Sequence, residues 1–369
     1  MQPRIKNGWL RAILFLPVWM IIVGIISGLA FYGVAAAKGI NTADHSVYDE
    51  SKFADLVWTY NADRGVDPLA PDSSTTIPED DLRKLKEQAT TIDIESFQKD
   101  VFGGEMSFDS PIMLLMSFFS LLGSFLALWF MMTFVNRQPL ASIGLSVENR
   151  GKEMLAGLAG ALVFIGGIFF ILWLIGAITI TGFVGFKPSV FIVSMMLFLA
   201  AFDEELIFRG YILNNMMDAT DNRWIALAGS SVLFALLHAG NQEVFSTFVP
   251  MSELFAAGFI LGISYTFTKN LWLPTFFHFG WNFFQGLFGF EISGFNVDSW
   301  KMIAHENTLI ENLYNDQGDI LKDQDIPEMI NKFPDIVSGG AFGIEGSVIS
   351  LCCTILGTYL IFKHYNDKE

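Results

Sequence analysis

Long apolar runs separated by short polar stretches are the main pattern of this chain. An α-helix rises about 1.5 Å per residue, so a run of roughly 20 apolar residues can cross the hydrocarbon core of a bilayer. We therefore expect an all-α fold, a polytopic transmembrane helix bundle of about eight spans. The predicted spans are about 12–37, 111–135, 154–180, 190–213, 224–240, 253–268, 271–290 and 341–362.

The composition supports a membrane protein. Of the 369 residues, 52% are hydrophobic and only 16% are charged, which is too apolar for an ordinary soluble domain. The net charge of -16 comes mainly from two segments, 38–110 and 291–340, so it describes exposed loops. Nucleic acid is not expected as a partner. The expected partners are the lipid bilayer and, through the acidic segments, an envelope protein.

Lys and Arg side chains beside the spans predict the orientation of the chain, because they favour the cytoplasmic side. We expect an integral protein of a bacterial plasma membrane with both termini cytoplasmic and both acidic segments outside. The first span is expected to be an uncleaved anchor, since its apolar core is too long for a signal peptide. The residues that all fall on one side are Arg4, Lys6, Arg11, Arg137, Arg150, Lys152, Arg223, Lys269, Lys363 and Lys368.

Five regions follow from this pattern. Residues 1–37 form the cytoplasmic N-terminus and first anchor, and 38–110 form an acidic extracytoplasmic segment. Residues 111–290 form the membrane core. Residues 291–340 form a second acidic extracytoplasmic loop, and 341–369 form the last transmembrane helix and a cytoplasmic tail.

Charged side chains stand inside the fourth predicted span, at Asp203, Glu204, Glu205 and Arg209. A charge at bilayer depth is costly unless it meets a partner or a water-filled cavity, so it indicates a functional site. Glu205 and Arg209 have the i, i+4 spacing at which a carboxylate and a guanidinium meet on one helix face. Glu204 points about 100° away from that face, which leaves it free to act as a base. The alternative is a charged helix end that reaches the membrane interface.

Two further spans carry histidine. His238 follows Phe234 by four residues, and His278 precedes Asn282 by four residues, so each pair lies on one helix face. Pro274, four residues before His278, is expected to weaken the local backbone hydrogen bonding. A single histidine in an apolar span is more often a packed side chain than a catalyst. Histidines in neighbouring spans beside an acid pair instead predict that these groups converge on one site.

The ordered motifs resemble the CPBP family of intramembrane proteases, which includes the type II CAAX prenyl endopeptidases and Abi-type proteins. The resemblance covers roughly 190–290 and leaves the first span and the acidic segments unexplained. It rests on two glutamates followed after three residues by arginine (Glu204, Glu205, Arg209), on Phe234 with His238, and on His278 with Asn282.

The resemblance implies an intramembrane endopeptidase that hydrolyses a peptide bond of a membrane-associated protein or peptide. In this interpretation Glu204, helped by His238, activates a water molecule. His278 and Asn282 then stabilise the oxyanion. The acidic exterior segments are typical of a bacterial envelope protein, so the resemblance is not extended to prenylated substrates.

Glu205 and Arg209 are expected to give structural support, and no cofactor is expected. A zinc-dependent version would take Glu204, His238 and His278 as ligands, because one carboxylate and two imidazoles can leave an open position on the metal. The chain has no His-Glu-x-x-His motif. The metal-free glutamate mechanism is therefore preferred.

Three other interpretations stay open. A serine protease would use Ser230 or Ser231 with His278 and would leave Glu204 without a role. A membrane scaffold or bacteriocin-immunity-type protein would use the acidic segments to bind an envelope partner. His305, which stands near Glu306, Glu311 and Asp316, is a candidate for a weak cation site, although a solvated acidic loop is the simpler interpretation.

Overall fold

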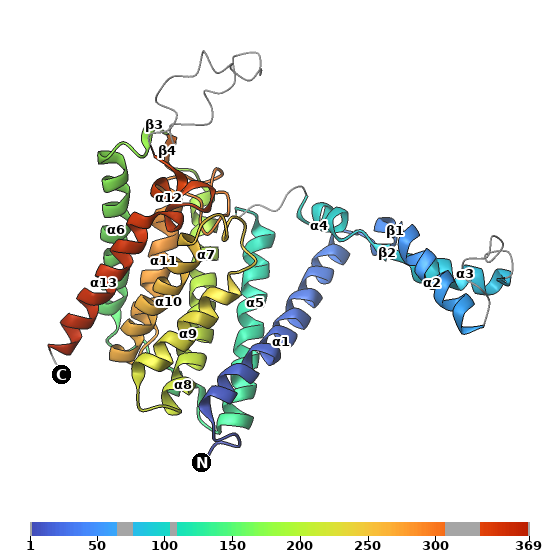
Figure 1. Cartoon of the computed structure of the whole chain (residues 1–369), viewed down its shortest axis with the longest axis horizontal. Helices are drawn as coiled ribbons and strands as arrows, with labels where there is room; N and C mark the ends of the chain where they lie inside the picture. Colours follow the sequence, from blue (N-terminus) through green and yellow to red (C-terminus); the bar gives the residue numbers. More distant parts are fainter. Residues whose placement is uncertain (1, 65–76, 104–108, 307–332, 368–369) are drawn as a thin grey trace. The chain divides into compact units, whose positions relative to one another are not determined.

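Helices make up most of the structure, a computed structural model that describes residues 2–64, 77–103, 109–306 and 333–367 (Figure 1). The chain divides into two compact units. We call Met1–Ser27 together with Ser107–Glu369 the core unit, and Gly28–Met106 the inserted unit. The prediction of an all-α polytopic fold is confirmed.

Every predicted span contains a helix. Two of these helices continue as π-helical segments, Met131–Asn136 after α5 and Leu206–Leu213 after α7. The helices are α1 (Gly8–Ala37, which continues into the inserted unit), α5 (Pro111–Phe130), α6 (Gly151–Leu174), α7 (Ser189–Glu205), α8 (Asn214–Asp218), α9 (Arg223–Leu237), α10 (Val249–Thr268), α11 (Trp272–Leu287), α12 (Asp335–Ser338) and α13 (Val348–Asn366).

Length and composition qualify five helices of the described part of the chain as membrane spans: α1, α5 with its π-helical extension, α6, α10 and α13. Helix α9 is apolar but shorter. The remaining helices at predicted spans, α7 and α11, have 17 and 16 residues. The number of eight spans therefore stays a prediction.

Two predicted spans are too long at the end opposite the chain termini. The helix in 154–180 ends at Leu174, and Gly176, at φ 75°, then turns the chain into strand β3 (Thr179–Phe183). This strand pairs antiparallel with β4 (Ile303–Glu306). The helix predicted from 341 begins at Val348, because two 3₁₀ turns, Gly340–Phe342 and Ile344–Gly346, come first.

The inserted unit is small and mostly helical. It has a 3₁₀ turn (Thr42–His45) and helices α2 (Glu50–Asp63), α3 (Glu79–Ala89) and α4 (Ile94–Phe102). Strands β1 (Ser46–Tyr48) and β2 (Thr90–Ile92) pair antiparallel. Its apolar core is formed by Ala35, Phe97 and Val101.

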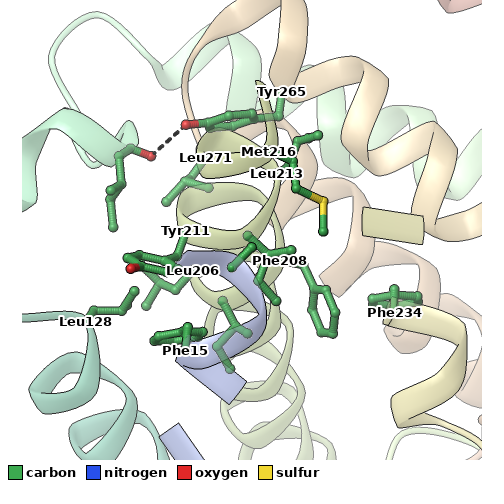
Figure 2. Close-up of a cluster of buried hydrophobic side chains, with 14 of the residues drawn as sticks. Phe15, Leu128, Leu206, Phe208, Tyr211, Leu213, Met216, Phe234, Tyr265 and Leu271 are labelled. Carbon is green, nitrogen blue, oxygen red and sulfur yellow. Dashed lines mark hydrogen bonds between the residues drawn. The ribbon is translucent and has the colours of Figure 1, made fainter. Parts of the chain in front are cut away.

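The π-helical segment Leu206–Leu213 forms the centre of the largest hydrophobic core, and all eight of its residues are buried. Figure 2 shows Phe15 of α1 and Leu128 of α5 beside Tyr211. The ring centroids of Phe15 and Tyr211 lie 4.4 Å apart. Helix α1 therefore packs into the core next to the segment that carries Arg209.

Candidate active site

Glu205 and Arg209 form a buried ion pair. Nη1 of Arg209 donates to Oε1 of Glu205 at 2.6 Å, and the two side chains are 1% and 0% exposed. Nη2 of Arg209 donates to the carbonyl of Gly258 on α10 at 3.0 Å. Gly258 allows this approach, since a Cβ atom there would lie 3.0 Å from the backbone of Ser231 on α9. The pair therefore links the end of α7 to α10 at a place where α9 and α10 are close.

The same carboxylate also holds a histidine, which the sequence analysis did not foresee. Nδ1 of His278 lies 2.9 Å from Oε1 of Glu205. A carboxylate accepts, so Nδ1 carries a proton and the ring turns its Nε2 atom in the other direction. That atom lies 3.9 Å from Oε2 of Glu204. Glu205 therefore sets the orientation of a second candidate catalytic group.

His238 approaches Glu204 from a different helix. It caps the C-terminus of α9, and its Nδ1 lies 2.8 Å from the carbonyl oxygen of Phe234. A carbonyl only accepts, so Nδ1 again carries the proton. Nε2 then points to Glu204, whose Oε2 atom is 3.8 Å away. Two imidazole nitrogens from two helices thus face one carboxylate oxygen.

Glu204 is also more accessible than its neighbours, with 32% of its side chain exposed. It borders a cavity of about 510 Å³, together with His238, His278 and Asn282. The four residues that the sequence analysis proposed as catalytic therefore line one space.

Pro274 does not weaken α11 in the way that was expected. The helix begins at Trp272, so Pro274 lies in its first turn. The N–H groups of a first turn have no partner within the helix, and a proline there costs no hydrogen bond. The expectation was wrong because the predicted span, which starts at about 271, already places Pro274 in its first turn, where no intrahelical hydrogen bond is lost.

The cavity also contains acidic side chains that were not assigned to the site. Asp203 is buried and accepts a hydrogen bond from Ser120 of α5 at 3.2 Å. Glu345, in the turn before α13, accepts from Nε1 of Trp281 at 3.0 Å and from the hydroxyl of Ser293 at 2.7 Å. The sequence signal for both was present, since each is an acid within or beside an apolar run.

No Lys or Arg side chain is found among the described residues that line the cavity. Its ionisable groups are the carboxyls Asp203, Glu204 and Glu345 and the two imidazoles. Arg209 lies behind the wall and is already paired with Glu205. The cavity is therefore suited to neutral or basic groups and unsuited to a carboxylate.

The turn after α11 borders the cavity through Ile292 and Ser293. Burial and the nearby Asp298 carboxylate raise the pKa of Glu291 in this turn to about 7, although Lys301 opposes the shift. Asp298 is itself paired with Lys301 at 2.5 Å, and this contact lowers the pKa of Asp298. The turn therefore carries an acid that changes its charge near neutral pH.

His305 is not the solvated loop residue that the simpler interpretation expected. Its ring packs against Phe290, with centroids 4.3 Å apart, and burial lowers the pKa of His305 to about 4. A neutral ring between aromatic side chains is not a solvated loop residue. Glu311 and Asp316, which were to complete a cation site, lie outside the described residues.

Ser230 and Ser231 lie apart from the cavity. Both are buried, and the Ser230 hydroxyl lies 3.4 Å from the carbonyl oxygen of Phe208. Neither serine lines the cavity. Within the described ranges, no group of three or more His, Cys, Asp or Glu side chains is placed to hold a metal ion.

Comparison with known proteins supports the resemblance. Residues 185–284 match the family model described as "Type II CAAX prenyl endopeptidase Rce1-like". The match spans α7, α9, α10 and most of α11, and it leaves out α1, α5 and α13. Comparison with curated proteins and with solved structures gave no match. Residues 185–284 are thus an Rce1-like domain of the type II CAAX prenyl endopeptidase kind, consistent with the CPBP family.

Proposed function

We propose that this protein is an intramembrane endopeptidase in which Glu204 and His238 activate the attacking water. The observation that carries the proposal is that Oε2 of Glu204 lies 3.8 and 3.9 Å from the Nε2 atoms of His238 and His278. The family match supports a protease, and the apolar helices support a site inside the bilayer.

The distances suit a bridging water. They exceed a direct hydrogen bond, and a polar contact of this length commonly holds a water between its two groups. Both Glu204 and the unprotonated Nε2 of His238 accept, so one water can donate a hydrogen to each. Removing a proton from that water produces the nucleophile that attacks the peptide carbonyl.

His278 and Asn282 are proposed to bind the oxygen that becomes negative during this attack. They lie one helical turn apart on α11, and both border the cavity. His278 donates from Nε2 only when the ring is protonated on both nitrogens, and the Glu205 carboxylate at Nδ1 favours that state. An amide N–H of Asn282 supplies the second donor.

Glu205 and Arg209 are proposed to hold this arrangement rather than to react. Their buried pair fixes the end of α7, and Glu205 also fixes the His278 ring. A zinc-dependent version would use Glu204, His238 and His278 as ligands. A chelator distinguishes that version from the metal-free mechanism.

The proposed substrate is a peptide bond in a membrane-associated protein or peptide. The scaffold hypothesis is the second candidate, because the acidic inserted unit lies outside the region that the family model matches. The scaffold would be favoured if deletion of residues 45–100 abolished the cellular phenotype while Glu204→Gln and His278→Ala left it intact. The opposite pattern favours hydrolysis.

The test is cleavage of a peptide library by the purified protein in lipid vesicles. Wild type is expected to cleave in the presence of a chelator, and Glu204→Gln is expected not to cleave. Glu148→Gln is the matched control, since it makes the same substitution at an exposed carboxylate away from the cavity. No cleavage by wild type under any condition would refute the protease, and loss with the chelator would refute the metal-free mechanism. Labelling of the protein by a serine-directed fluorophosphonate would instead support a serine protease.

A further inference from the structure

The turns that carry Lys and Arg beside the predicted spans meet at one end of the core unit, which we call the basic end. Both ends of the chain lie there (Figure 1). The contacts that join these turns are Arg4 N to Val135 O at 2.8 Å, Leu271 N to Gly144 O at 3.0 Å, Arg11 Nη2 to Asp218 Oδ2 at 3.1 Å, and Arg223 over the Phe267 ring at 5.4 Å.

The turns at the opposite end are joined to one another in the same way. Gly294 donates to the carbonyl of Phe342 at 3.1 Å, and Ser293 donates to Glu345. These turns supply Ser293 and Glu345 to the cavity wall, and the turn after α9 supplies Asn241. By contrast, none of the turns 137–150, 219–222 and 269–271 at the basic end contributes a lining residue. The cavity is therefore continuous with one end of the core unit only.

Packed side chains separate the cavity from the basic end. Leu206 and Tyr211 are fully buried, and the Phe15 ring lies against Tyr211 (Figure 2). Beyond them, the buried Arg11 side chain donates to Asn215 at 2.6 Å. Asn136 donates to the same Asn215 oxygen at 2.8 Å, and Tyr211 donates to Asn136 at 2.8 Å. This apolar layer and polar network leave the opposite end as the route for water to Glu204.

The length of α9 also places polar backbone near that route. Its 15 residues extend about 22 Å, which is less than the roughly 30 Å of a hydrocarbon core. The turn that follows His238, with Asn241, thus begins inside the depth of the bilayer. Irregular backbone is stable at such depth only where it is buried in protein or lines a water-filled cavity. Asn241 is in fact a lining residue.

We propose that the cavity opens to water, and receives its substrate, at the end opposite the basic end. Lys and Arg mark the cytoplasmic side, so this is the extracytoplasmic face of the membrane. The substrate class is then a peptide segment outside the membrane, next to the membrane anchor of an exported protein. The substrate class rests on the proposed hydrolysis, whereas the side of access does not.

The experiment measures labelling of single cysteines by a membrane-impermeant sulfonated maleimide in right-side-out and inside-out vesicles. The background carries Cys352→Ala and Cys353→Ala, which removes both native thiols. The test positions on the cavity wall are Asn241→Cys and Ser117→Cys. The controls are Phe118→Cys, which is exposed next to Ser117 but does not line the cavity, and Lys269→Cys at the basic end.

Asn241→Cys and Ser117→Cys are expected to react in right-side-out vesicles, and Lys269→Cys only in inside-out vesicles. Phe118→Cys, which faces lipid, is expected to react in neither. Reaction of the cavity cysteines only in inside-out vesicles, or in neither preparation, would overturn the proposal. Reaction of Lys269→Cys in right-side-out vesicles would overturn the extracytoplasmic assignment. Labelling needs no turnover, so these results are distinct from failure of the proposed protease activity.

Discussion

Oε1 of Glu205 accepts from both Nη1 of Arg209 at 2.6 Å and Nδ1 of His278 at 2.9 Å. One buried oxygen thus fixes a guanidinium on its own helical run and an imidazole on α11. The consequence is that Nε2 of His278 faces Glu204. The acid that sequence spacing assigned to structural support therefore also orients a candidate catalytic ring.

Arg209→Ala is expected to destabilise the protein strongly. Removing one partner of a buried pair leaves the Glu205 carboxylate with only its bond from His278, and such a change typically costs about 3–5 kcal/mol. The measurement is the free energy of unfolding in detergent. The control is Arg150→Ala, which removes the partly exposed pair with Glu153 and should cost about 1 kcal/mol or less. Equal losses in the two variants would show that the Glu205 pair is not a support.

Peptides that end in a free carboxylate are expected to be poorer substrates than their C-terminal amides. The cavity lining has the carboxyls Asp203, Glu204 and Glu345, and none of its described residues is Lys or Arg. Placing like charges together costs several kcal/mol, so the preference for the amide should be about tenfold or more in kcat/KM. Asp203→Asn, which keeps the shape of the side chain, should reduce this preference. A preference for the free acid would contradict the electrostatic account of the cavity.

The stability of the protein is expected to fall as the pH rises through about 7, because of Glu291. Its folded-state pKa is raised above the ordinary value, so the folded state binds the proton more tightly than the unfolded state does. The contribution is fully present below the ordinary glutamate pKa and is lost as pH rises through 7. The measurement is the midpoint of thermal unfolding between pH 5 and 8.

Glu291→Gln supplies the control for this pH dependence. It cannot ionise, so the fall in the unfolding midpoint should become shallower in that variant. Asp298→Asn would remove a neighbouring charge that raises the Glu291 pKa, and it should move the transition to lower pH. An unchanged pH profile in both variants would assign the pH dependence to other groups.

The sequence predicted the broad fold because the apolar runs are long enough to cross a bilayer. It placed a helix in every predicted span, and it paired Glu205 with Arg209 correctly, because both depend on spacing along one helix. It did not predict the π-helical segment Leu206–Leu213. The hydrogen bonds of a π-helix join residues five apart instead of four, and an apolar run carries too weak a periodicity to show that difference.

Contacts between distant segments were also beyond the sequence. The bond from His278 to Glu205 joins residues 73 positions apart, and Glu345 reaches Trp281 across 64 positions. Neither spacing has a period that a pattern could reveal. The sequence did place Glu204, His238, His278 and Asn282 as one set, because ionisable groups are rare in apolar spans.

The central claim is that Glu204 and His238 act on one water, and a double-mutant cycle of kcat tests it most directly. Glu204→Gln should lower kcat by about 10²–10⁴-fold without unfolding the protein, as should His238→Ala to a smaller extent. His364→Ala, at an exposed histidine on α13, is the matched control. If the two groups act together, the double variant should lose about as much as Glu204→Gln alone. Losses that multiply in the double variant would contradict the account.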